Sequence, residues 1–277
     1  MSGDCLEPEE EPVSAESWPI DNIWNLLGRK EIRRQSVILL CEVGSSIHGI
    51  SVAGYDDLDL IAIRIEEWTE LINGPERRQA MMVRTKPEGV RSRFGDIDIQ
   101  VYTLRKFVGL ALGGNPSILT ALFSPERRTA DTAQWDKLAR LVPSRLAGKA
   151  FLGYMRQQME RWQGTRGQRN VNRPELVEAF GFDTKYAGHV IRLGIQGAEY
   201  VSTARMTLPM PAADAVVVRS VREGKHTEEE ALDIARQVEA DLLAAIARSP
   251  LPEQPATIAA QAWLADRYEK HYRILHP

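Results

Sequence analysis

Apolar residues in the first half of the chain form short runs and alternating patterns that are typical of β-strands. A nearly continuous apolar run over 37–43 predicts a buried strand. Residues 94–102 alternate between apolar and polar side chains, which predicts a strand with one buried face. Two further strands are expected over 57–64 and 79–84. Helices are expected over 18–34, 66–72, 104–112 and 117–123, with a short helix that starts near Ile47.

The second half of the chain has few strand patterns and is predicted to be helical. The expected helices cover about 132–141, 144–164, 174–180, 184–200, 227–248 and 255–273. The helix after Thr227 begins with a capping-box pattern, because Glu230 lies three residues further on. We therefore predict a disordered acidic tail over 1–16, a mixed-sheet domain over 17–125 and a helical domain over 126–277.

The composition is that of an ordinary globular protein, with 43% hydrophobic and 26% charged residues. No apolar run approaches the roughly 20 residues that span a membrane, so no membrane partner is expected. The acidic N-terminus lacks the pattern of a secretory signal. Cys5 and Cys41 are too few for a disulfide framework or a zinc site, so a reducing, cytoplasmic compartment is expected.

The charge is unevenly distributed along the chain. Residues 1–21 contain seven acidic residues and no lysine or arginine, so the net charge of −3 becomes +4 for residues 22–277. A mildly basic body is compatible with binding to nucleic acid. We interpret the acidic segment as a disordered solubilising tail. The alternative is a nucleic-acid mimic that covers a basic groove.

The first candidate chemistry follows the buried strand. That strand ends at Gly44-Ser45, a turn with little side-chain bulk, and such a backbone can approach a phosphate closely. Asp57 and Asp59 follow in the next strand, where residues i and i+2 share a face. Two adjacent carboxylates repel each other unless a cation lies between them. Oxygen ligands suit Mg²⁺, which also binds substrate phosphates.

A third carboxylate is expected from the strand over 94–102. Asp96 and Asp98 share its outward face, and Asp98 is the main candidate. Three carboxylates from two strands can hold two metal ions roughly 4 Å apart. In that arrangement one ion would lower the pKa of an attacking hydroxyl, and the other would hold a triphosphate.

These motifs resemble those of a known superfamily. Gly44-Ser45, the Asp57-x-Asp59 pair and the distant Asp98 are similar to the pattern of polymerase-beta-type nucleotidyltransferases. More specifically, about residues 36–275 resemble the polymerase-beta-like proteins associated with RNA repair. The segments that carry this closer resemblance are 98–107, Gly114-Asn115-Pro116, Gly153-Tyr154, Phe182-Asp183-Thr184-Lys185 with His189 and Arg192, and Leu208-Pro209.

The resemblance implies a fold and a set of site residues. The fold would be α+β, a polymerase-beta-type nucleotidyltransferase mixed sheet with flanking helices, followed by a helical C-terminal domain. Asp57, Asp59 and Asp98 would be catalytic and would hold two ions of Mg²⁺ or Mn²⁺, with Asp98 rather than Asp96 as the third ligand. The implied nucleotide-binding residues are Gly44, Ser45, Lys106, Lys185, His189 and Arg192.

Three of these residues share one face of a predicted helix. Lys185, His189 and Arg192 lie at positions i, i+4 and i+7, and all three can bind phosphate. Asp183 is the expected N-cap of this helix. The alternatives are a solvated charged face and, for His189, a hydrogen-bonded histidine between domains.

The implied function is transfer of a nucleoside monophosphate from an NTP to an acceptor hydroxyl, with release of pyrophosphate. The association with RNA repair favours an RNA 3′ end as the acceptor, and tRNA is one candidate. Two alternatives stay open: transfer to a protein or a small molecule, and a non-catalytic module that binds nucleic acid.

Arginines are concentrated around Trp162. The segment is interpreted either as a contact for nucleic-acid phosphates, with Trp162 available to stack on a base, or as a polar loop. The arginines are Arg156, Arg161, Arg166, Arg169 and Arg173. His48 has no metal-ligand spacing and is assigned no chemistry.

Overall fold

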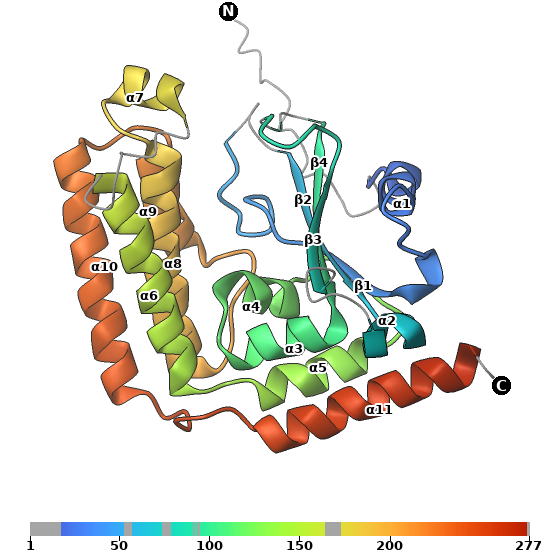
Figure 1. The fold of residues 1–277 in the computed structure, drawn as a ribbon. Coiled ribbons are helices and arrows are strands. Elements are labelled where there is room, and N and C mark those ends of the chain that lie inside the picture. Colours follow the sequence, from blue (N-terminus) through green and yellow to red (C-terminus); the bar gives the residue numbers. More distant parts are fainter. Residues whose placement is uncertain are drawn as a thin grey trace, which may run out of the picture.

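The computed structural model describes residues 18–52, 57–73, 79–90, 92, 95–163 and 173–275. A five-stranded sheet lies at the centre of this part of the chain. Helix α1 (Ile20–Gly28) lies beside the sheet, and α11 (Thr257–Leu275) runs along the base of the molecule (Figure 1). A bundle of long helices stands on the opposite side of the sheet from α1 in this view.

The sheet is mixed, as predicted. Its strands are β1 (Val37–Glu42), β2 (Leu58–Arg64), β3 (Ala80–Arg84), β4 (Ile97–Thr103) and β5 (Arg127–Arg128), in the order β3-β4-β2-β1-β5. β2 and β4 run parallel, whereas the other neighbouring pairs are antiparallel. The register of the parallel pair places Asp59 directly opposite Asp98.

Alternate residues of the strands are buried on opposite faces of the sheet, as the pleat requires. On one face, Leu40 and Leu60 pack in a cluster with Ile23 of α1. On the other face, Cys41 packs in a larger cluster that includes Phe107. Burial on both faces explains the nearly continuous apolar run of β1.

Short helices connect and cover the strands. These are a 3₁₀ turn (Arg34–Ser36), α2 (Trp68–Asn73), α3 (Leu104–Leu112) and α4 (Pro116–Phe123). The hydroxyl of Thr103 accepts a hydrogen bond at the start of α3, and the amide oxygen of Asn115 does the same for α4. Local capping therefore fixes where both helices begin.

The bundle is built around α8 (Thr184–Thr203). It packs against α6 (Arg145–Gln163), α9 (Ala212–Arg222) and α10 (Glu228–Arg248), and α7 (Pro174–Phe180) precedes it. The predicted N-cap is confirmed, because Asp183 accepts from the Tyr186 amide. Small residues let the helices approach closely: a Cβ at Gly194 would lie 2.3 Å from Cγ1 of Val238.

Two helices of the predicted C-terminal domain lie against the sheet domain. α5 (Thr132–Leu141) and α11 pack together, and α11 also packs against α3. The phenol of Tyr268 donates to the buried carboxylate of Glu66 at 2.5 Å, and Tyr272 donates to the Glu66 carbonyl at 2.6 Å. The last helix therefore packs against the segment that follows β2, the strand that carries Asp59.

The structure corrects two local predictions and adds one helix that was not predicted. The prediction of a short helix near Ile47 is wrong, because residues 45–49 form turns that end at Gly49 with φ +69°. The first helix ends at Gly28 rather than at residue 34. Helix α9 was missed, because its run of three valines is more typical of a strand. Val218 is buried in the larger hydrophobic cluster, and this packing favours a helix over a strand.

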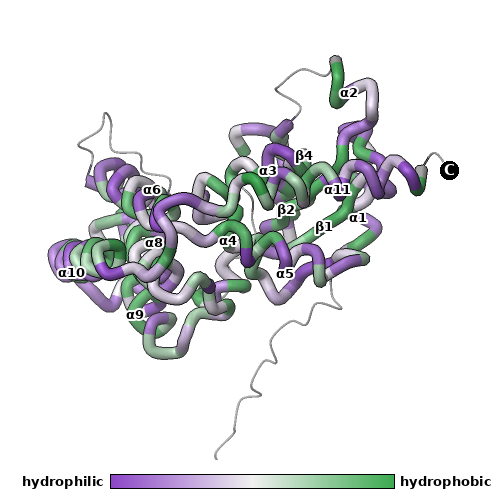
Figure 2. Tube along the Cα trace, turned by 90° about the horizontal axis from the view of Figure 1, so that it is seen from below, coloured by the Kyte–Doolittle hydropathy of each residue, from purple (hydrophilic) through white to green (hydrophobic). Residues whose placement is uncertain are grey.

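Hydropathy follows this arrangement. Apolar and polar residues alternate along most of the helices in Figure 2, as expected for helices with one face against a core. Within the described residues, no helix has the length and apolar character needed to span a membrane.

Candidate functional site

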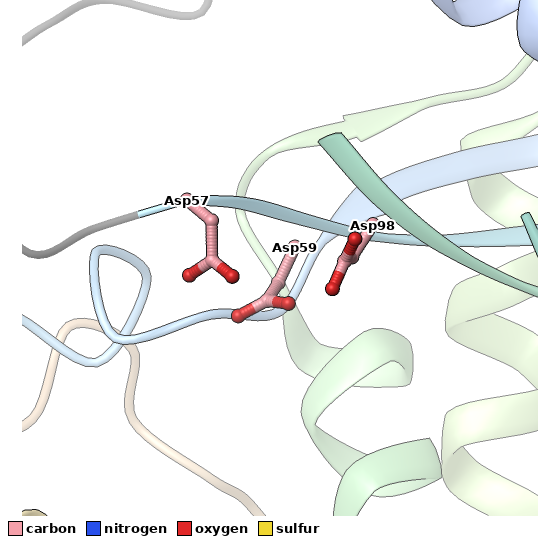
Figure 3. A group of neighbouring side chains, drawn as sticks. All are labelled: Asp57, Asp59 and Asp98. Carbon is pink, nitrogen blue, oxygen red and sulfur yellow. The ribbon is translucent and has the colours of Figure 1, made fainter. Parts of the chain in front are cut away.

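The three predicted carboxylates come together where two parallel strands begin. Asp57 immediately precedes β2, and Asp59 and Asp98 are the second residues of β2 and β4. All three side chains project to the same side of these strands (Figure 3). Each is half-buried, and one oxygen atom from each lies within 4.8 Å of the others. This arrangement offers a set of oxygen donors of the kind that Mg²⁺ and Mn²⁺ bind.

Asp98 is held in place from the neighbouring strand. Arg84 of β3 lies opposite Asp98 and donates to both carboxylate oxygens, at 3.1 and 3.0 Å. The hydroxyl of Ser92 lies 2.9 Å from each of these oxygens. The hydrogen bonds to Asp98 raise the pKa of Arg84. A bidentate pair of this kind fixes the orientation of the carboxylate.

Asp96 has different partners. Its Oδ1 atom accepts from the Thr85 hydroxyl at 2.9 Å and lies 3.6 Å from Nζ of Lys86. Asp96 is buried and does not belong to the group of carboxylates that could share an ion. The structure therefore brings Asp98, and not Asp96, next to Asp57 and Asp59.

A cavity of about 210 Å³ opens beside the carboxylates, between the sheet and the bundle. Asp59 lines one side of it, next to the Gly44-Ser45 turn. Lys185, His189 and Arg192 of α8 line another side. Gly44 is required by close packing, because a Cβ there would lie 2.9 Å from Oδ2 of Asp59. The helix face that the sequence predicted therefore faces the turn and the carboxylate.

Arg192 is half-buried in this wall, and its hydrogen-bond partners are neutral side chains. Its Nη1 lies 3.0 Å from Nε2 of His48 and donates to Oε1 of Gln196 at 2.7 Å. Its Nη2 lies 2.9 Å from Nδ1 of His189. Burial and the nearby charge of Arg222 lower the pKa of Arg192 to about 10.

The hydrogen-bonding groups around Arg192 include one more donor than the available acceptors can pair with. A guanidinium can only donate, so Nε2 of His48 must accept and Nδ1 must carry the imidazole proton. Nδ1 of His48, however, lies 3.0 Å from the amide nitrogen of Gln196, which also donates. Exchanging the oxygen and nitrogen of Gln196 only moves the conflict to Arg192.

Burial holds the two histidines neutral. Desolvation and the charge of Arg192 lower the pKa of His189 to about 3 and that of His48 well below its ordinary value. Burial also lowers the pKa of Lys185, an effect that the Asp57 carboxylate counteracts. The surroundings of the cavity wall therefore lower the pKa values of its basic groups. A bound anion would raise these pKa values.

Residues from distant parts of the chain hold the turn in place. The Met210 amide donates to the His48 carbonyl at 3.1 Å, and the guanidinium of Arg222 donates to the carbonyl of Ile50. His48 and Arg222 both line the cavity, although sequence reasoning assigned a role to neither. His48 lies three positions after Ser45, and this closeness to the candidate turn is a signal that could have indicated its role. Arg222 lies in the missed helix α9 and gave no such signal.

The comparison with known proteins identifies the family. A model of the RNA repair pathway DNA polymerase beta family matches residues 23–266. The chain belongs to this family. No curated protein matches it. A solved nucleotidyltransferase-like protein from Exiguobacterium sibiricum is similar, with 11% identity, a TM-score of 0.28, and coverage of 91% of this chain and 77% of that one. Membership of the polymerase beta family agrees with the observed α+β architecture.

Lys106 is the one nucleotide-binding candidate that the structure places away from the cavity. In this polymerase beta family member, it is an exposed residue of α3, which follows the carboxyl end of β4. Asp98 lies near the beginning of the same strand. At about 3.3 Å per residue, the five steps from Asp98 to Thr103 alone cover roughly 17 Å. The prediction for Lys106 is therefore not supported by its position.

The arginine-rich segment divides into different environments. Arg156 is exposed and pairs with Glu239 at 2.5 Å. Trp162 is not available for stacking on a base, because its buried ring stacks on Phe182 and its indole nitrogen donates to Glu228. Arg161 and Arg173 line a second cavity next to the first. Residues 166 and 169 lie outside the described part of the chain.

Proposed function

We propose that this protein is a divalent-metal-dependent nucleotidyltransferase that transfers a nucleoside monophosphate from an NTP to the 3′ hydroxyl of an RNA. The observation that carries the proposal is the pairing of opposite charges across one cavity. Asp59 lines the cavity and forms a group of oxygen donors with Asp57 and Asp98, and Lys185 and Arg192 provide cationic donors on the cavity wall. A metal–triphosphate complex needs both kinds of partner.

The carboxylates fit a divalent ion. Three carboxylate oxygens within 4.8 Å of one another form a hard donor set, and self-repulsion favours a cation between them. A carboxylate has about four lone-pair positions, so Asp98 keeps accepting capacity beside Arg84 and Ser92. Bound ions, which we expect to be two Mg²⁺ or Mn²⁺, would neutralise triphosphate charge and lower the pKa of the acceptor hydroxyl.

The cavity wall would hold the triphosphate. Arg192 lines the cavity, and its guanidinium would donate a charge-assisted hydrogen bond to a phosphate oxygen. Lys185 would donate from the same helix face, and Gly44-Ser45 would allow the backbone to approach the phosphates. A bound phosphate would also raise the pKa of His189 and favour its charged, donating form.

The reaction would be an in-line displacement. The acceptor hydroxyl oxygen forms a bond to the α-phosphorus, the bond to the α–β bridging oxygen breaks, and pyrophosphate leaves with those electrons. Asp98, oriented by Arg84, would accept the hydroxyl proton and pass it to solvent. Lys185 and Arg192 would stabilise the charge on the departing pyrophosphate. RNA is proposed as the acceptor because the matched family belongs to an RNA repair pathway.

The test is a transfer assay with each labelled NTP, Mg²⁺ or Mn²⁺, and total RNA, protein or small-molecule acceptors. We expect label in RNA with the wild-type protein and none with Asp59→Asn. NTP binding is measured separately by calorimetry, since Asp59→Asn should still fold. Wild-type protein that neither binds an NTP nor labels any acceptor would contradict the proposal.

A further inference from the structure

A second cavity, of about 640 Å³, adjoins the first on the side of Asp98. The two cavities share Lys185 and His189, so α8 forms a wall common to both. The second cavity is also lined by Arg84, whose guanidinium donates to Asp98. A molecule in this cavity would therefore have one end near the carboxylate that is proposed to accept the hydroxyl proton.

The second cavity carries excess positive charge. Arg161 of α6, Arg173 and Lys185 line it, together with the buried acid Asp183. The Asp183 carboxylate accepts from the Tyr186 amide as the N-cap of α8, and burial raises its pKa. The charge of Arg173 is one of the causes that lower the pKa of Lys185, which shows that these cations act on each other. Clustered cations of this kind favour a polyanionic ligand.

We infer that the second cavity binds the acceptor, and that the acceptor is a single-stranded nucleic acid whose backbone phosphates contact Arg161 and Arg173. This inference rests on the proposed nucleotidyl transfer and assigns its acceptor side. Arginine presents a planar fork of donors that matches phosphate oxygens. A neutral small molecule or an unmodified protein hydroxyl would not need two such groups.

The shape and the aromatic lining agree with this acceptor. The second cavity is about three times the volume of the first, so it accommodates more than a triphosphate. The half-buried ring of Tyr186 lines it, and single-strand binding combines a basic groove with aromatic rings on which bases stack. With Trp162 packed on Phe182, Tyr186 takes the stacking role that the sequence suggested for the tryptophan.

The chain offers a matched control for the arginines. Arg156 lies on α6, as Arg161 does, but it pairs with Glu239 and lines neither cavity. Arg156→Ala therefore removes the same charge from the same helix without removing the proposed phosphate contact. If the arginines only attract RNA by long-range electrostatics, both substitutions will weaken RNA binding. If Arg161 contacts a phosphate directly, only Arg161→Ala will weaken it.

The experiment measures binding of a short fluorescein-labelled single-stranded oligoribonucleotide by fluorescence anisotropy at several salt concentrations. We expect Arg161→Ala and Arg173→Ala each to weaken binding roughly tenfold. Each should also reduce the slope of log affinity against log salt by about 0.7, since one phosphate contact is lost. Arg156→Ala should match the wild-type protein, and NTP affinity should stay unchanged in all three variants. Arg161→Gln replaces Arg161→Ala if the alanine variant melts at a lower temperature.

Other results would overturn the inference. Wild-type protein that binds NTP but no oligonucleotide would contradict it. An equal loss of oligonucleotide affinity in Arg156→Ala and Arg161→Ala would also contradict it. Label transferred to a protein or a small molecule, with none in RNA, would leave nucleotidyl transfer intact and remove the nucleic-acid acceptor. RNA binding that depends on Arg161 and Arg173, without any NTP binding, would support the phosphate site and overturn the nucleotidyl transfer.

Discussion

Nη1 of Arg192 lies 3.0 Å from Nε2 of His48, although 144 positions separate the two residues in the chain. The contact joins the turn after β1 to the middle of α8, and the candidate triphosphate cavity lies between them. Neither the sheet nor the bundle forms this cavity alone. Desolvation lowers the pKa of Arg192, so its charge is less favourable in the ligand-free protein than it would be beside a bound anion.

Replacing Arg192 should therefore separate binding from stability. We expect Arg192→Met to lower NTP affinity roughly ten- to hundredfold, since a charge-assisted hydrogen bond contributes about 1.5–3 kcal/mol. Without NTP, the melting temperature should stay the same or rise, because a buried charge and a donor conflict are removed. Calorimetric titration with NTP and Mg²⁺, together with thermal unfolding, measures both effects. Lys185→Ala should also weaken NTP binding.

The control for Arg192→Met is Arg205→Met. Arg205 is exposed just beyond α8 and lines neither cavity. Its replacement should leave NTP affinity and melting temperature close to those of the wild-type protein. Unchanged NTP affinity in Arg192→Met would show that the guanidinium has a structural role and does not contact phosphate.

Gly44 should tolerate no side chain. The Cβ of Gly44→Ala would lie 2.9 Å from Oδ2 and 3.0 Å from Cβ of Asp59, so this carboxylate must shift. Misplacement of a catalytic group by about 1 Å can lower the rate roughly hundredfold. We expect a loss of that size in labelled-NTP transfer, with a folded protein by circular dichroism. Gly109→Ala is the control, because its Cβ meets nothing within 4 Å. Equal activity of the two variants would contradict the prediction.

The four carboxylates should differ in how strongly their replacement lowers transfer activity. Asp57→Ala, Asp59→Ala and Asp98→Asn should abolish transfer, and the first two should keep or gain thermal stability in the absence of metal, because repulsion is relieved. Asp96→Asn should only impair transfer, since Asp96 contacts Thr85 and Lys86 instead. Transfer rates and melting temperatures are measured side by side. Loss of activity in Asp96→Asn but not in Asp98→Asn would reverse the assignment of the third ligand.

Acid should destabilise the protein through His48 and His189, whose pKa values are lowered in the fold. The pKa of His189 is lowered to about 3 and that of His48 also falls, whereas both titrate near 6.5 in an unfolded chain. Below that pH the unfolded state binds more protons, so the free energy of unfolding falls as the pH drops. For each histidine the decrease is up to about 1.4 kcal/mol per pH unit.

Urea unfolding between about pH 7 and pH 5 measures this dependence. His189→Gln and His48→Gln should each show a shallower fall in the free energy of unfolding than the wild-type protein, because one buried titrating group is removed. Identical pH dependence in the wild-type protein and both variants would show that the histidines are not held neutral in the fold.

Local periodicity predicted most of the secondary structure. The alternation over 94–102 located β4, and the apolar run over 37–43 located β1. Spacing of two residues placed Asp57 and Asp59 on one face, and spacing of four and seven residues placed Lys185, His189 and Arg192 on one face of α8. These relations follow from the geometry of a single strand or helix, so the sequence alone determines them.

Relations between elements needed the tertiary structure. Parallel pairing of β2 with β4 places Asp59 opposite Asp98, and pairing of β3 with β4 places Arg84 on the same carboxylate. Packing of the bundle against the turn brings His48 and Arg222 into the cavity and leaves Lys106 at the far end of β4. No local pattern encodes these contacts, because they depend on which hydrophobic faces are buried against each other, and they join residues that are from 14 to 172 positions apart in the chain.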